Sequence, residues 1–156
     1  MQGLHLTADL HQCPPGRAAM VDPAVLRALC VGAVRDAGLH AVGELFHRYP
    51  PGPGTAPDAV AGITGVVLLA ESHLAVHTWP EIGAVTLDVY VCNFGADNSA
   101  RAHALLDALI AAFAPTRIER HAMERGALRA ERRAAPKPAR IPSGDRSAYS
   151  SDEGSS

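Results

Sequence analysis

Two neighbouring segments of the chain, residues 72–79 and 84–94, alternate apolar and polar side chains, and this alternation limits the fold more than any other feature. A period of two residues is typical of a strand with one buried face. The residues between them, Pro80 to Gly83, begin with a proline and end with a glycine, which predicts a turn. The chain therefore carries an antiparallel hairpin whose apolar face the rest of the domain must cover.

The remaining segments supply four more strands and two helices. Asp22 and Pro23 form a helix start with Asp as the N-cap, and the apolar stripe that follows ends near Gly38. A second helix is capped by Asp97 or Ser99. Further strands are expected at residues 4–10, 40–49, 63–70 and 117–123. The order β-α-β-β-β-β-α-β predicts an α+β fold, a two-layer α/β sandwich with a mostly antiparallel sheet and two helices on one face.

The C-terminal residues differ from the rest of the chain in composition. Residues 125–156 hold half of the 14 Lys and Arg residues and become rich in Pro and Ser. Such a composition buries too little apolar surface to fold. We expect a folded domain over residues 1–124 and a disordered, basic, Ser-rich tail over residues 125–156.

Charge, hydropathy and cysteine usage exclude several classes of protein. The net charge of −2 gives no reason to expect a nucleic-acid partner. No apolar run approaches the ~18–20 residues of a membrane span, and the N-terminus lacks the features of a signal peptide. The three cysteines show no CxxC pairing. A cytoplasmic protein without disulfides is the simplest interpretation.

The face of the hairpin opposite its apolar residues is expected to carry chemically active side chains. These are His73, His77, Trp79, Asp88 and Cys92. If Trp79 pairs with Ala84, the register of the hairpin places Cys92 across from Glu71. Ser72 is then diagonal to Cys92. A thiol, a hydroxyl and a Glu-Ser peptide bond therefore fall within one small region.

These residues allow three chemical interpretations. His73, His77 and Cys92 could bind zinc, although no fourth ligand is evident. Ser72 or Cys92 could act with a histidine in a hydrolase, although no GxSxG motif is present. They could also be ordinary polar residues on a solvated sheet face. Ser72 and His77 are five residues apart, so a bend near Ser72 is needed for these two side chains to meet.

The same stretch resembles a known family, the prokaryotic S-adenosylmethionine decarboxylase proenzymes. The resemblance lies in residues 65–81, which read Gly-Val-Val-Leu-Leu-Ala-Glu-Ser-His-Leu-Ala-Val-His-Thr-Trp-Pro-Glu, and in Asp88 and Cys92. Residues 46–49 are also similar to the family, and the likeness covers about residues 4–124. It implies a self-cleaving, pyruvoyl-dependent enzyme that converts S-adenosylmethionine to CO2 and the decarboxylated aminopropyl donor of spermidine biosynthesis.

The resemblance implies roles for the residues that make and use the cofactor. Ser72 attacks the carbonyl of Glu71, and β-elimination then cleaves the chain between these residues, leaving residue 72 as a pyruvoyl group. His77 assists this processing, and Thr64 stands where the family has a supporting hydroxyl, usually Ser. The pyruvoyl ketone forms a Schiff base with the substrate amine, so neither a metal nor PLP is expected. Cys92 is the proton donor to the substrate carbon.

The resemblance also implies a binding site for S-adenosylmethionine. Tyr49 matches an aromatic residue that stacks on adenine, Glu81 a carboxylate that binds the ribose hydroxyls, and Trp79 a wall of the site. Two positions depart from the family, because Ile82 stands where an aromatic residue is expected and Asn93 where a glycine is expected.

Two alternatives remain open beside this interpretation. Relatives of the fold include pyruvoyl-dependent L-arginine and L-ornithine decarboxylases, which need no adenine site; the presence of Tyr49 and Glu81 favours S-adenosylmethionine. An uncleaved regulatory subunit would lack Ser72 or Cys92, and both are present. The family further implies a homodimer of cleaved protomers, with a small-molecule substrate and neither nucleic acid nor membrane as partner. Activation by putrescine is left undecided.

Overall fold

The computed structural model describes residues 2–50, 54, 56, 60–93 and 95–126. Among these residues, six strands form one antiparallel sheet in the order β2-β3-β4-β5-β1-β6. The strands are β1 (Gly3–His11), β2 (Ala41–Arg48), β3 (Ile63–Leu69), β4 (Ser72–Trp79), β5 (Ala84–Cys92) and β6 (Arg117–Arg125). The helices are α1 (Pro23–Asp36) and α2 (Ser99–Phe113), with two short 3-10 helices, η1 (Ala18–Met20) and η2 (Pro80–Ile82).

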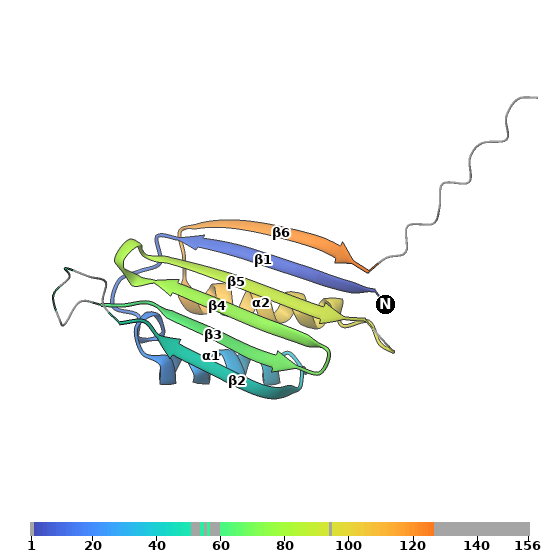
Figure 1. The fold of residues 1–156 in the computed structure, drawn as a ribbon. Coiled ribbons are helices and arrows are strands. Elements are labelled where there is room, and N and C mark those ends of the chain that lie inside the picture. Colours follow the sequence, from blue (N-terminus) through green and yellow to red (C-terminus); the bar gives the residue numbers. More distant parts are fainter. Residues whose placement is uncertain (1, 51–53, 55, 57–59, 94, 127–156) are drawn as a thin grey trace, which may run out of the picture.

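The sheet and the two α-helices form two layers. Figure 1 shows α1 and α2 side by side behind the same face of the sheet. We call the opposite face the helix-free face, because no helix of the described residues covers it. The expected two-layer α+β sandwich is therefore confirmed, including its order of elements.

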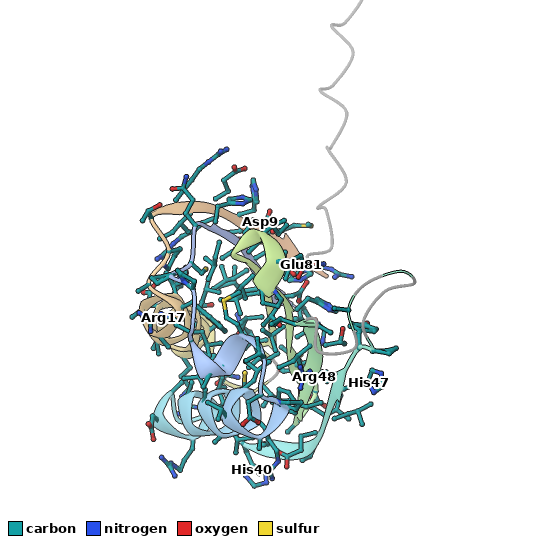
Figure 2. All side chains as sticks on the ribbon, turned by 90° about the vertical axis from the view of Figure 1, so that its left-hand side faces the viewer. Asp9, Arg17, His40, His47, Arg48 and Glu81 are labelled. Atoms are coloured by element: carbon teal, nitrogen blue, oxygen red, sulfur yellow. The ribbon has the colours of Figure 1, made fainter. Side chains whose placement is uncertain are left out.

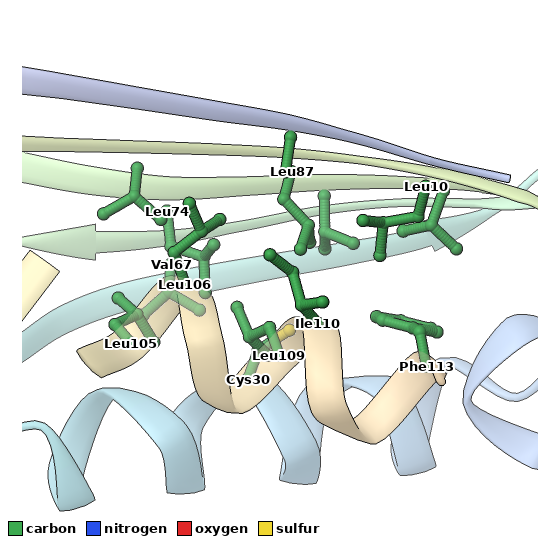
Figure 3. Close-up of a cluster of buried hydrophobic side chains, with 14 of the residues drawn as sticks. Leu10, Cys30, Val67, Leu74, Leu87, Leu105, Leu106, Leu109, Ile110 and Phe113 are labelled. Atoms are coloured by element: carbon green, nitrogen blue, oxygen red, sulfur yellow. The ribbon is translucent and has the colours of Figure 1, made fainter. Parts of the chain in front are cut away.

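The apolar core fills the space between the layers. Alternate residues of the strands, such as Leu74 and Leu87, point toward the helices and are almost fully buried. Figure 3 shows these side chains meeting Leu109 and Phe113 of α2 and Cys30 of α1. Burying a side chain of this size contributes ~1.5–3 kcal/mol, so the core stabilises the helix-covered face strongly. Burial also raises the pKa of the Cys30 thiol to about 12.

Local capping signals explain where the helices begin, with one correction. The carboxylate of Asp22 accepts a hydrogen bond from the amide of Ala24 at 2.8 Å, so Asp22 is the N-cap of α1 as expected. The N-cap of α2 is Asn98, not Asp97 or Ser99. The Asp97 carboxylate still accepts from the amide of Ser99 at 2.9 Å, and hydrogen bonds from Ser99 lower its pKa. The sequence misplaced the cap because three consecutive residues here can each cap a helix.

Several boundaries differ slightly from those expected. β5 ends at Cys92, and β6 continues to Arg125 because it pairs with β1 along its whole length. The expected C-terminal tail lies, from residue 127 onward, outside the described residues. None of the helices in the described ranges has the length and apolar character that crossing a bilayer requires.

Candidate active site

The turn between β3 and β4 holds a strained residue. Leu69 pairs with Ser72 across the hairpin, so Ala70 and Glu71 alone make the turn. Glu71 has a φ of +59°, in the left-handed region that favours glycine. This conformation costs a side-chain-bearing residue roughly 1–2 kcal/mol. The strain lies directly before the peptide bond that joins Glu71 to Ser72.

Ser72 and Cys92 lie together beside this turn. The hydroxyl oxygen of Ser72 accepts a hydrogen bond from the backbone amide of Cys92 at 3.0 Å. Cys92 is only 5% exposed. The expected hairpin register is confirmed, because Trp79 pairs with Ala84 and the ladder continues toward Cys92 without a shift. We call Glu71, Ser72 and Cys92 the cleavage cluster.

A network of asparagine side chains holds the backbone of Cys92 in place. The Asn98 side-chain amide donates to the carbonyl of Cys92 at 3.0 Å. The side-chain oxygen of Asn93 accepts from the amide of Asn98 at 2.9 Å, and its nitrogen donates to the Ser99 hydroxyl at 3.2 Å. Asn93, which departs from the family pattern, therefore ties the end of β5 to the start of α2. Sequence reasoning missed Asn98, since only the fold brings its side chain back to Cys92.

A second group of polar side chains lies on the helix-free face where β2, β3 and β4 meet. Thr64 pairs with His77 across the strands, and its hydroxyl lies 2.9 Å from the Nδ1 of His77. The hydroxyl of Tyr49 lies 2.7 Å from the same Thr64 oxygen. We call Tyr49, Thr64 and His77 the histidine cluster. The ring of Trp79 packs beside that of His77, with centroids 5.9 Å apart.

Glu81 and Ile82 border a cavity at the same end of the molecule as the histidine cluster. The cavity measures about 600 Å³ and is mostly apolar, with Met20, Val60 and Pro80 among its lining residues. Glu81 contributes the only carboxylate among the described residues that line it. Figure 2 looks onto this end, with Glu81 and His47 both in view. An apolar cavity beside a carboxylate is suited to a flat ring that carries hydroxyl groups.

The cleavage and histidine clusters lie at opposite ends of β4. The strand runs unbroken from Ser72 to Trp79, so the bend that would bring Ser72 to His77 does not exist. At ~3.3 Å per residue, five residues of strand separate these two residues by about 17 Å. Ser72 also falls on the helix-covered side of the alternation and His77 on the helix-free side. One chain therefore does not bring Ser72 and His77 together.

The same spacing argues against the two alternative chemistries. His73 and His77 are four residues apart on one strand, which is about 13 Å and too far to share a metal ion with Cys92. Across the described ranges, no three His, Cys, Asp or Glu side chains are placed to hold a metal ion. A Ser72–His77 pair within one chain fails for the same reason, so the geometry does not support a hydrolase dyad.

Comparison with known proteins agrees with the sequence resemblance. The model of a protein family described as S-adenosylmethionine decarboxylase matches residues 4–126. The S-adenosylmethionine decarboxylase proenzyme of Aquifex aeolicus is 36% identical over 129 residues, covering 83% of this chain and 84% of the relative. That of Persephonella marina is 36% identical over 124 residues, 80% of this chain and 82% of the relative. The crystal structure of the adenosylmethionine decarboxylase from Aquifex aeolicus has a TM-score of 0.68 at 35% identity, covering 83% of this chain and 94% of that one.

Proposed function

The chain belongs to the S-adenosylmethionine decarboxylase family, and from this premise we propose that it cleaves itself before Ser72 and then decarboxylates S-adenosylmethionine. The observation that carries the proposal is the cleavage cluster. Glu71 is strained, Ser72 follows it directly in the chain, and the backbone amide of Cys92 donates a hydrogen bond to the Ser72 hydroxyl. The product would serve as an aminopropyl donor. The three unpaired cysteines suit a reducing cytoplasm as its location.

The cleavage step uses groups that the turn already holds. The hydroxyl oxygen of Ser72 attacks the carbonyl carbon of Glu71, and the peptide bond becomes an ester as the amine of Ser72 leaves. Elimination then breaks the bond between Cβ and oxygen of residue 72 and releases the Glu71 carboxylate. The new chain end takes up water and loses ammonia to become the pyruvoyl group. Because Glu71 sheds its left-handed backbone conformation on release, its strain favours the forward direction.

Three residues would handle the substrate after cleavage. When present, the pyruvoyl group supplies a ketone for the substrate amine and an acceptor for the electron pair that CO2 leaves behind. Cys92 then gives a proton to the substrate carbon, since its position beside residue 72 is fixed by Asn98. The exposed ring of Tyr49 would stack on adenine, and Glu81 would accept hydrogen bonds from the ribose hydroxyls.

A homodimer would complete the site that one chain leaves divided. The helix-free face exposes apolar side chains, among them Leu45, which is 68% exposed, and Leu68 and Met123. Suppose that two such faces pack about a two-fold axis that crosses β4 near Ala75. Each end of β4 in one protomer then lies opposite the other end of β4 in its partner. The cleavage cluster of one protomer then meets the histidine cluster of its partner. The partner's His77 then approaches the Glu71–Ser72 peptide bond from the helix-free face, without a bend in β4.

Measuring CO2 release tests the substrate assignment. S-adenosylmethionine, L-arginine and L-ornithine, each labelled at the carboxyl carbon, are given separately to the purified, fully cleaved protein. We expect release from S-adenosylmethionine alone, and none with the matched Ser72→Ala protein. Release from arginine or ornithine and not from S-adenosylmethionine would overturn the proposal.

A further inference from the structure

A carboxylate on the helix-free face connects three strands near the cleavage cluster. Asp88 of β5 lies 2.8 Å from the Nε2 of His5 on β1 and 3.4 Å from the Nε2 of His73 on β4. The ring of Tyr90 packs against both imidazoles, with centroids 5.9 Å from that of His5 and 5.6 Å from that of His73. The proposed cleavage and proton donation use none of these side chains.

The contacts of His5 fix the direction in which this group is hydrogen-bonded. The guanidinium of Arg125 lies 3.3 Å from the Nδ1 of His5, and a guanidinium only donates. Nδ1 of His5 is therefore the acceptor, and Nε2 carries the proton that it donates to Asp88. Arg125 also lies over the ring of Tyr90, 5.6 Å from its centroid. The carboxylate is thus oriented by a chain of contacts that begins on β6.

Cleavage changes what holds residue 72. In the intact chain, the two-residue turn ties Ser72 to Leu69. After cleavage, residue 72 is a chain end, and chain ends fray unless other contacts hold them. The pairing that remains is that of His73 with Tyr90 on β5 and Leu68 on β3.

We propose that Asp88 is a positioning residue, which holds His73 after cleavage and so keeps the reactive end of β4 against Cys92. This inference rests on the proposed function. The 3.4 Å contact closes to a charge-assisted hydrogen bond with a small turn of the His73 ring. Since a displacement of 1 Å between reacting groups can cost about 100-fold in rate, a mobile residue 72 would slow turnover. Before cleavage the turn already holds Ser72, so Asp88 does not contribute to the cleavage step.

Replacing Asp88 with alanine tests the proposal through steps before and after cleavage. We expect Asp88→Ala to cleave itself at the wild-type rate within about twofold, by intact mass, and then to lose about tenfold in kcat with KM changed less than about twofold. Hydrogen exchange at residues 73–75 should accelerate in cleaved Asp88→Ala and stay unchanged when Ser72→Ala blocks cleavage. Asp107→Ala is the control, because it removes the carboxylate bonded to Arg120 without touching β4.

Three results would overturn the proposal. The first is that Asp88→Ala keeps the kcat and the hydrogen exchange of the wild type. The second is that Asp88→Ala no longer cleaves itself. The third is that its exchange accelerates equally when Ser72→Ala blocks cleavage, which would mean that Asp88 has a general structural role. If Asp88→Ala does not fold, Arg125→Gln is used instead, because it removes the donor that orients His5. We expect Arg125→Gln to lose about threefold in kcat, and an unchanged kcat would overturn the proposal. If the wild type releases no CO2 from S-adenosylmethionine, the proposed function fails, while the exchange comparison still tests the hold on His73.

Discussion

The two ends of β4 present different kinds of polar site. At the first end, the cleavage cluster is built from the backbone: a left-handed Glu71 and a main-chain amide that donates to Ser72. At the other end, the histidine cluster is built from side chains, with the Thr64 hydroxyl 2.9 Å from His77 and 2.7 Å from Tyr49. Neither cluster alone holds both the Ser72 hydroxyl and an imidazole. The proposed function would draw on both ends, although one chain keeps them apart.

Removing the nucleophile gives the largest expected effect at the first end. Ser72→Ala should abolish cleavage, because it removes the hydroxyl that attacks the Glu71 carbonyl in the proposed reaction. Intact-mass analysis after prolonged incubation should show a single 16.3 kDa chain. Cleavage of this variant between residues 71 and 72 would contradict the division of roles between the two ends.

Cys92→Ala separates cleavage from turnover at the same end. The backbone amide that donates to Ser72 survives this substitution, so the chain should still cleave itself. Turnover should fall at least about 100-fold, since a positioned proton donor contributes 10²–10⁴-fold. Cys30→Ala is a matched control, because Cys30 is also buried and lies outside both clusters and outside the lining of the cavity beside Glu81. Unchanged CO2 release from cleaved Cys92→Ala would remove this thiol from the mechanism.

At the other end, the hydroxyl of Thr64 can be deleted without changing the shape of the side chain. Thr64→Val removes the hydrogen bonds to His77 and Tyr49 and should slow cleavage about tenfold, the equivalent of one hydrogen bond. Thr64→Ser keeps the hydroxyl and should cleave at nearly the wild-type rate. Equal rates for the two variants would mean that the histidine cluster plays no part in processing.

Relieving the strain at Glu71 should have the smallest effect. Glycine adopts a φ of +59° without penalty, so Glu71→Gly should stabilise the precursor by about 0.5–1 kcal/mol and slow cleavage about fivefold. Ala114→Gly relieves a similar conformation at the end of α2 and should stabilise the protein without slowing cleavage. Denaturant unfolding and timed mass analysis measure both quantities. Faster cleavage in Glu71→Gly would show that strain does not drive the reaction.

The sequence predicts the fold well because its signals are local. The alternation in residues 72–79 and 84–94 was sufficient to predict both the pairing and the buried face, and Asp22 with Pro23 marked the start of α1. The N-cap of α2 was misplaced because Asn98 is engaged with Cys92 and three neighbouring residues compete for the role.

The candidate site was only partly predictable from sequence. The proximity of Ser72 to Cys92 followed from the hairpin register, whereas the contact of Thr64 with His77 depends on the register between β3 and β4, which no sequence signal fixed. A bend near Ser72 was the condition for Ser72 and His77 to meet within one chain, and it is absent because β4 runs unbroken from Ser72 to Trp79. The contact of His5 with Asp88 joins residues 83 positions apart, so no local sequence pattern could predict it.

Trans-complementation tests most directly whether the two ends of β4 act together across a dimer. His77→Ala and Ser72→Ala chains that carry different tags are co-expressed, and dimers that carry both tags are isolated. Mass spectrometry then measures the mass of each chain. We expect the His77→Ala chain to be cleaved slowly on its own and to be cleaved before Ser72 at a higher rate in these mixed dimers, because the partner supplies the imidazole. An intact His77→Ala chain in dimers proven to contain both variants would contradict a site shared between protomers.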